Sequence, residues 1–259
     1  MKKHLLLALL FITSSSFEIQ KDSAYDTGEW FKFRIHYGLL SAGYATLELK
    51  ESVRSNKKVF HAVGNGYTVG MFKFFFKVDD NYESYFDKLT GKPFQYVRKI
   101  DEGGYTKNQE GFFNQDLNKI TVKDYKNKTE KSFNVSEDVQ DIISTFYYLR
   151  NHPNVDKLKI GESIAVDMFF DDEITKFKLK FIGREDLETK FGTIPTMIFR
   201  PMVQTGRIFK EQESVTVWIS DDENKLPVSI KASLAVGSLK ADLDGFKGLK
   251  NSFTIKAKP

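Results

Sequence analysis

Alternation between apolar and polar side chains is the feature that most constrains how this chain of 259 residues can fold. Segments in which every second residue is apolar occur at 31–37, 43–50, 176–181, 215–219, 228–234 and 239–243. Glycines, prolines and Asp/Asn pairs separate these segments. A two-residue period is typical of antiparallel strands with one face in the core and the other in water. The sequence therefore predicts a mainly β protein, built as one large sheet or a barrel-like domain.

The middle of the chain departs from this pattern and has the period of a helix. Its apolar residues are spaced three or four positions apart, at Val139, Ile142, Ile143, Phe146 and Tyr147. Ser136 can cap the N-terminus of such a helix, and Pro153 can stop it. We therefore expect one central helix at about 137–150, whose aromatic face packs onto the sheet or fills a gap in it.

Residues 1–16 have the pattern of a secretory signal peptide. Lys2 and Lys3 are followed by eight apolar residues at 5–12, and then by Ser14 and Ser16. Eight residues of helix span about 12 Å, which is too short for the ~30 Å core of a bilayer. The pattern predicts cleavage after Ser16, and the alternative is an N-terminal core helix.

The absence of cysteine restricts the cellular locations expected for an exported chain of this kind. A bacterial lipoprotein needs a cysteine after its apolar run to carry the lipid, so we do not expect a lipoprotein. No later run approaches 18 apolar residues, so no transmembrane segment is expected after cleavage. The sequence predicts a soluble protein of the periplasm or the extracellular space, with an irregular leader at 17–27 and a single β-rich domain at 28–259.

The charge balance argues against a nucleic-acid-binding protein. The chain has 39 Lys and Arg against 35 Asp and Glu, a formal net charge of +4. Removing Lys2 and Lys3 with the signal peptide leaves 37 against 35, or +2. Nucleic-acid-binding domains concentrate a larger basic excess on one face. We therefore expect no nucleic acid as a partner.

Catalytic and metal-binding patterns are sparse. Without cysteine there is no thiol nucleophile, and after cleavage the histidines are His36, His61 and His152. Neither a His-Glu-x-x-His pair nor a Gly-x-Ser-x-Gly elbow occurs. The acidic clusters at 171–173 and 221–224 lie between alternating segments, where Asp and Asn favour turns. The sequence thus assigns no catalytic residue, no metal ligand and no cofactor, and it favours a binding protein over an enzyme.

Aromatic residues make up 14% of the chain, and some of them suggest a ligand site. Segment 71–76 is predicted as a strand with apolar side chains on both faces, and segments 142–149 and 168–170 also look apolar on both faces. A strand that is apolar on both faces is covered on both, by protein or by ligand. The residues that we expect to contact such a ligand are Phe72, Phe74, Phe75 and Phe76. The alternative is that they belong to the core.

Four segments, at 28–49, 79–104, 141–150 and 215–243, together resemble the exported bacterial proteins of domain-of-unknown-function family 3108. The resemblance runs over nearly the whole chain after residue 27, in order. It implies a large curved antiparallel sheet or partly open barrel with one central helix, similar to periplasmic lipoprotein carriers. It carries no catalytic residues over to this chain.

These observations favour an exported, non-enzymatic envelope protein that binds an apolar or amphipathic ligand, such as a lipid, or a partner chain on a curved sheet. Two alternatives stay open. One is a hydrolase of envelope polysaccharide or lipid that uses a carboxylate pair or a histidine. The other is a structural or assembly module that acts through a sheet edge.

Overall fold

The computed structural model describes residues 23–54, 56–203 and 215–256; the predicted signal peptide lies outside these residues. Within these ranges, fourteen strands and two α-helices follow one another. They are β1 (Trp30–Tyr37), β2 (Leu40–Arg54), β3 (Lys57–Thr68), α1 (Gly70–Phe75), β4 (Asp79–Asp87), β5 (Pro93–Glu102), β6 (Tyr105–Asn114), β7 (Lys119–Asp124), β8 (Thr129–Asn134), α2 (Ile142–Arg150), a 3₁₀ turn (Val155–Lys157), β9 (Ser163–Phe170), β10 (Glu173–Thr189), β11 (Gly192–Val203), β12 (Val215–Ser220), β13 (Pro227–Ser233) and β14 (Ser238–Lys247).

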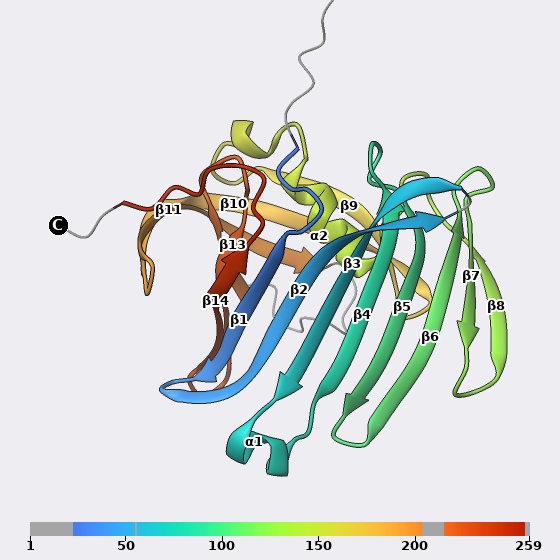
Figure 1. Ribbon diagram of the computed structural model, residues 1–259, viewed down its shortest axis with the longest axis horizontal. Helices are drawn as coiled ribbons and strands as arrows, with labels where there is room; N and C mark the ends of the chain where they lie inside the picture. The colour runs from blue at the N-terminus through green and yellow to red at the C-terminus, as the bar shows by residue number, and fades with distance from the viewer. Residues whose placement is uncertain (1–22, 55, 204–214, 257–259) are drawn as a thin grey trace, which may run out of the picture.

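All fourteen strands belong to one antiparallel sheet, in the order β8-β7-β6-β5-β4-β3-β2-β1-β14-β13-β12-β11-β10-β9. Neighbours in the sheet are neighbours in the chain, except that β1 pairs with β14. Irregular pairing between Lys32 and Phe33, and between Phe181 and Gly183, marks points at which strands bend. The sheet curls so that β9–β11 run behind the strands at the front of Figure 1. The predicted mainly β fold with a large curved sheet is confirmed.

The two edge strands, β8 and β9, approach each other but do not pair within the described residues. The chain between β8 and α2 lies in this gap, where Gln140 pairs with β9. The Gln140 N–H donates to the Asp167 carbonyl at 2.9 Å, and the Phe169 N–H donates to the Gln140 carbonyl at 2.8 Å. Phe133 of β8 also packs on Phe169 of β9, with ring centroids 5.4 Å apart. The sheet is therefore a barrel that is almost, but not fully, closed.

Helix α2 occupies the inside of this curve, behind β2 and β3 in Figure 1. Leu149 packs with Leu179, Phe181 and other core residues of β9–β11. Tyr147 packs in the opposite direction, among core residues that include Leu49 and Phe86 of β2 and β4. The helix thus forms the centre around which both halves of the sheet fold.

The helix begins five residues later than the predicted start at 137, and its N-cap is Asp141 rather than Ser136. Asp138 has a φ of +60°, which a helix does not accommodate. Gln140 uses its backbone groups to pair with β9, as described above. Tertiary pairing therefore removes this segment from the helix, although its apolar spacing continues the helical period.

The strand predicted at 71–76 is wrong. Strand β3 ends at Thr68, and Gly70 has a φ of +56°, in the left-handed region that glycine tolerates best. The chain then forms the short helix α1 in the connection to β4. The alternation of Phe72, Phe74 and Phe76 with other residues is therefore not the period of a strand.

Residues 23–29, directly before β1, form no helix or strand, but they are not peripheral. Ala24 and Tyr25 are buried, and they pack with Phe60, Phe86 and Tyr147. The hydrophobic core therefore begins before residue 28.

Candidate functional site

The N-terminus of α2 is fixed to the sheet through Asp141. Its carboxylate accepts hydrogen bonds from the N–H groups of Ile143 and Ser144, each at 2.8 Å, and from the Ser84 hydroxyl of β4 at 2.6 Å. The Ser144 hydroxyl accepts from the Asp141 N–H in return, at 2.9 Å. Burial raises the pKa of the Asp141 carboxyl to about 6, although these hydrogen bonds lower it.

The C-terminus of α2 is fixed by a buried ion pair. The Arg150 guanidinium donates to both carboxylate oxygens of Glu29, at 2.6 and 2.7 Å, and both side chains are almost completely buried. It also donates to the carbonyl of Asn224 in the β12–β13 turn, and to that of Ala24. Burial has the largest single effect on the pKa of Arg150 and lowers it, but the charge and hydrogen bonds of Glu29 together with the nearby Tyr147 and Tyr25 raise it further, so the net direction is upward. Arg150 therefore joins the C-terminus of the helix to the segment before β1 and to the β12–β13 turn.

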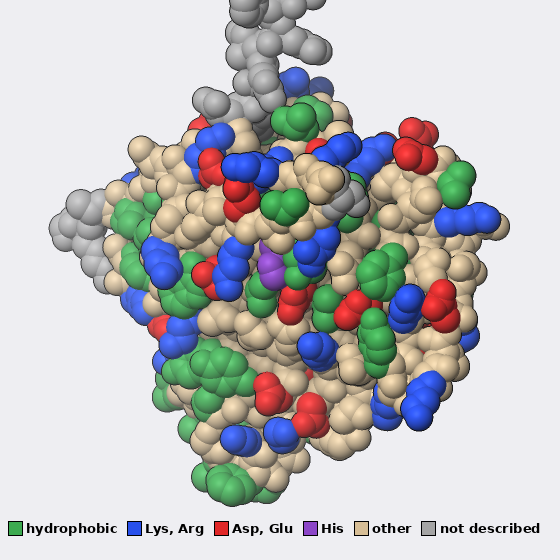
Figure 2. Space-filling view, turned by 45° about the vertical axis from the view of Figure 1, so that its right-hand side comes forward, with side chains coloured by type: hydrophobic (Ala, Val, Ile, Leu, Met, Phe, Trp, Pro, Cys, Tyr) green, Lys and Arg blue, Asp and Glu red, His purple; other side chains and the backbone are tan. Residues whose placement is uncertain are grey.

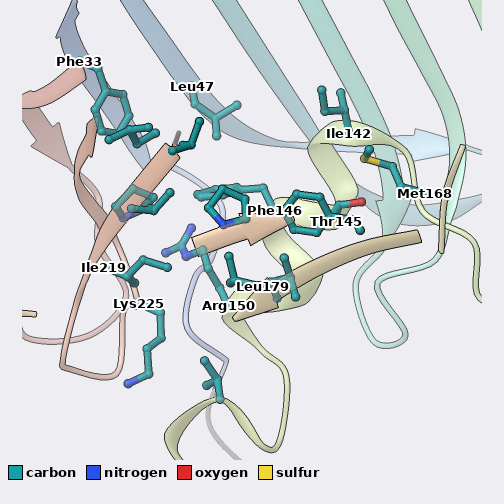
Figure 3. A pocket seen from close by; sticks show the side chains of 18 residues that line it. Phe33, Leu47, Ile142, Thr145, Phe146, Arg150, Met168, Leu179, Ile219 and Lys225 are labelled. Carbon is teal, nitrogen blue, oxygen red and sulfur yellow. The ribbon is translucent and has the colours of Figure 1, made fainter. Parts of the chain in front are cut away.

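Between these two anchors, α2 and the sheet enclose a partly open cavity of about 420 Å³ (Figure 3). Phe33 and Leu47 lie on one side of it, Leu179 and Ile219 on the other, and Phe146 of the helix between them. Its walls come from α2, from β1 and β2, and from β9 to β13. The full lining is Phe33, Leu47, Ile142, Thr145, Phe146, Leu149, Arg150, Val155, Met168, Phe177, Leu179, Pro201, Val215, Val217, Ile219, Lys225, Pro227 and Ile230.

The polar residues in the lining use their polar atoms elsewhere. The Thr145 hydroxyl donates to the Asp141 carbonyl at 2.7 Å. Arg150 is held by Glu29, and the Lys225 ammonium lies 2.7 Å from the Asp156 carboxylate. The cavity therefore presents an almost purely apolar surface, and its volume falls within the roughly 300–1,000 Å³ of ligand pockets.

The four predicted site residues do not line this cavity. The structure places Phe72, Phe74 and Phe75 in α1 and Phe76 directly after it, where the last three are exposed. Whether they contact a ligand stays a prediction, but not one that concerns this cavity.

Part of the cavity lining comes from the two other segments that the sequence singled out. Segments 142–149 and 168–170, which look apolar on both faces, supply Ile142, Phe146, Leu149 and Met168. The residues that sequence reasoning missed come from the strands of the second half, such as Val217 and Ile219. Their alternation marked one face as apolar, but nothing local distinguishes a face that lines a cavity from one that is packed.

Two of the histidines, His36 and His61, are paired with carboxylates away from the cavity. His36 Nε2 lies 2.7 Å from Asp242, and His61 Nε2 lies 2.7 Å from Glu83. His61 also stacks on Tyr85, with ring centroids 4.0 Å apart. Within the described part of the chain, no group of three or more His, Asp or Glu side chains is arranged to hold a metal ion.

The predicted turns at the acidic clusters are present. Asp171 and Asp172 connect β9 to β10 with positive φ angles of +50° and +65°. Asp171 also binds Arg98 of β5 and Lys107 of β6, both at 2.5 Å. The turn therefore joins the two halves of the sheet across the gap.

Edge strand β8 is poorly suited to strand addition. Its side chains are mostly exposed, and Glu130 and Lys131 stand on it. Charged side chains on an edge oppose pairing with another chain.

None of the helices in the described ranges is long and apolar enough to span a membrane.

Comparison with known proteins agrees with this architecture. A crystal structure of a β-barrel-like protein of domain of unknown function DUF1849 from Brucella abortus superposes with a TM-score of 0.59, at 10% sequence identity, over 87% of this chain and 99% of that one. A crystal structure of "a putative lipoprotein from Parabacteroides distasonis" covers 87% of this chain and 100% of its own at 9% identity, but with a TM-score of only 0.34.

The first likeness concerns the fold alone, because the sequence identity is low. No curated protein matches the chain. The family model of the protein of unknown function DUF3108 matches residues 32–244, which include β2 to β13 and most of β1 and β14. The chain therefore belongs to the DUF3108 family.

Proposed function

We propose that this protein is an exported binding protein that holds an apolar or amphipathic ligand with an acyl chain in the cavity beside α2, without chemical turnover. The observation that carries the proposal is the lining of that cavity, which is apolar apart from three residues whose polar groups are already bound within the protein. Such a surface offers a ligand hydrophobic contact and shape, but no fixed hydrogen-bonding partner.

The energetics favour a chain-like ligand. Each methylene group transferred from water to an apolar site contributes roughly 0.8 kcal/mol. About ten buried methylenes therefore contribute roughly 8 kcal/mol, which offsets a large part of the cost of immobilising the ligand. A polar headgroup has no partner in the lining, so it is expected to remain at the opening.

A fluorescent fatty-acid analogue tests this proposal on protein purified from its host. We expect saturable binding that long-chain fatty acid or phospholipid displaces. Val217→Trp places an indole in the cavity and should abolish binding, and Ile230→Phe, on the paired strand β13, should weaken it.

Thr216→Trp is the matched control, because the neighbouring residue of the same strand points to the other sheet face. Binding should survive this change. Unsaturable binding by the native protein, or equal loss in the Thr216 and Val217 variants when both melt cooperatively, would contradict the proposal. Covalent change of the bound lipid, seen by mass spectrometry, would instead favour the hydrolase alternative.

Export is part of the proposal and rests on the pattern of residues 1–16. The mass of the protein recovered from the cell envelope should begin at Phe17. Native mass spectrometry of the same sample should reveal lipid that copurifies with the protein.

A further inference from the structure

One end of the sheet carries a set of exposed apolar side chains that the cavity does not use. In an antiparallel meander, every second connection lies at the same end, which here includes the β1–β2 turn, the β3–β4 connection with α1, and the β13–β14 turn. Their exposed residues, with the exposed fraction of each, are Leu39 (99%), Leu40 (63%), Met71 (72%), Phe74 (91%), Phe75 (80%), Phe76 (55%), Leu234 (53%) and Val236 (77%).

The three connections are adjacent in space. The Tyr37 hydroxyl beside the β1–β2 turn donates to the carbonyl of Val236 at 2.9 Å, which places the β13–β14 turn next to it. On the other side, the Val69 N–H directly before α1 donates to the Ala42 carbonyl of β2 at 3.0 Å. The exposed side chains therefore stand on neighbouring connections at one end of the sheet, and we call this set of residues the hydrophobic tip. Figure 1 places α1 at the bottom of the molecule, and Figure 2 shows hydrophobic side chains gathered there.

The charge of the hydrophobic tip is also unusual. Residues 38–41, 70–76 and 234–239 contain a single charged residue, Lys73, in a chain of which 29% is charged. No acidic residue occurs in these segments. The acids nearest to α1 lie in β4 and β5 and not in these three segments: Lys77, which follows α1, pairs with Asp101 at 2.5 Å and also lies near Asp79.

We propose that the hydrophobic tip docks on the surface of a lipid bilayer that contains anionic headgroups. Large exposed apolar patches mark sites of protein or membrane contact. Here the side chains protrude from separate connections and do not frame a groove, and a fluid hydrocarbon accepts such projections without a complementary shape. Lys73, at the level of the headgroups, would attract anionic lipid.

The position of the hydrophobic tip relative to the cavity supports a lipid surface. Strand β11 ends and β12 begins at this same end of the sheet, and their residues Pro201 and Val215 line the cavity. The cavity thus reaches toward the end that would face the bilayer. The docking itself does not depend on ligand binding, so the two proposals can fail separately.

Sedimentation with vesicles tests the docking. The probes are vesicles of phosphatidylethanolamine and phosphatidylglycerol at a ratio of three to one, and vesicles of phosphatidylcholine alone. Burial of one Phe side chain strengthens association roughly tenfold or more. The double variant Phe74→Ser/Phe75→Ser should therefore bind the first vesicles at least about tenfold more weakly than the native protein. Lys73→Gln should weaken binding to these anionic vesicles about fivefold and leave binding to phosphatidylcholine unchanged.

The matched control is Leu89→Ser/Leu117→Ser. These two leucines are 87% and 64% exposed on the β4–β5 and β6–β7 turns, at the opposite end of the sheet. The control should bind vesicles as the native protein does, and both double variants should keep the native melting temperature and the binding of the fluorescent fatty acid.

No binding of the native protein to either vesicle, or equal loss in the two double variants, would overturn the proposal. Self-association that Phe74→Ser/Phe75→Ser abolishes, without vesicle binding, would also overturn it and assign the hydrophobic tip to a second copy of the chain.

Discussion

The buried ion pair between Glu29 and Arg150 leads to a specific prediction about the free energy of unfolding. Glu29→Leu leaves the guanidinium of Arg150 without its counter-charge, inside a shell formed by the rings of Tyr25, Phe31 and Phe146, each 5.2–5.5 Å from the guanidinium carbon. An uncompensated buried charge typically costs about 3–5 kcal/mol of the free energy of unfolding. Arg150→Met leaves Glu29 buried without a partner and should cost a similar amount.

The double variant separates the energetic contribution of the ion pair from that of the hydrogen bonds around it. Glu29→Leu/Arg150→Met removes both charges and refills the volume with apolar atoms, but it leaves the carbonyls of Asn224 and Ala24 without their donor. Each buried unsatisfied group costs about 1–3 kcal/mol. The double variant should therefore lose about 2–6 kcal/mol, below the sum of about 6–10 kcal/mol for the two single variants, so the two losses are not additive.

Urea denaturation followed by circular dichroism measures these values. The exposed pair Lys190–Asp244, at 2.5 Å, is the control, and its removal should cost less than about 1 kcal/mol. Single losses below about 1 kcal/mol at Glu29 and Arg150, or additivity within about 0.5 kcal/mol, would refute the reasoning, because both would mean that water reaches the pair.

Two further predictions concern α2. The pKa of Asp141 is raised by burial to about 6 in the folded protein from 3.8, so its stabilising contribution is complete below pH 3.8 and is lost as the pH rises through 6. Relative to Asp141→Asn, the native protein should lose about 3 kcal/mol of unfolding free energy between pH 3.5 and 7.5, and urea titrations at both pH values that give a constant difference would contradict this. The Tyr147 hydroxyl is buried without a hydrogen-bonding partner, so Tyr147→Phe should leave stability unchanged or raise it by up to about 1 kcal/mol. A loss above about 1 kcal/mol in thermal or urea unfolding would mean that the hydroxyl is satisfied.

Local patterns in the sequence were sufficient for the strands but not for the segments whose conformation is decided by distant partners. Phe177, Leu179 and Phe181 alternate in the sequence and lie in β10 as expected. Residues 137–141 keep the helical spacing and yet lie outside α2, because Gln140 pairs with a backbone partner in β9 more than twenty residues ahead, which competes with the helix. Segment 71–76 fails for a different reason, since one glycine with positive φ turns a strand-like run into a short helix.

The cavity depends on sheet curvature, which local sequence does not contain. Alternation indicates that Val215, Val217 and Ile219 share one face, but the distance of that face from α2 follows from the irregular pairing and the stagger of many strands. The aromatic content directed attention to the run Phe72–Phe76, which lies in and directly after α1 and outside the cavity. Composition alone does not separate an exposed run of Phe from a buried one, so it could not place these residues.

The pairing of β1 with β14 has a consequence for how the chain acquires its structure. The pair of His36 and Asp242 across this seam joins positions 206 residues apart, whereas every other strand pairs with a strand adjacent in the chain. Closing a loop of that length costs on the order of 5 kcal/mol of chain entropy. The hairpins β1–β8 and β9–β14 can therefore assemble early as two local arrays, and their union at β1 and β14 is the late, slow event. Until the last strand is available, β1 presents an unprotected edge, so a protein that begins to fold before its C-terminus is free is exposed to aggregation at its first strand.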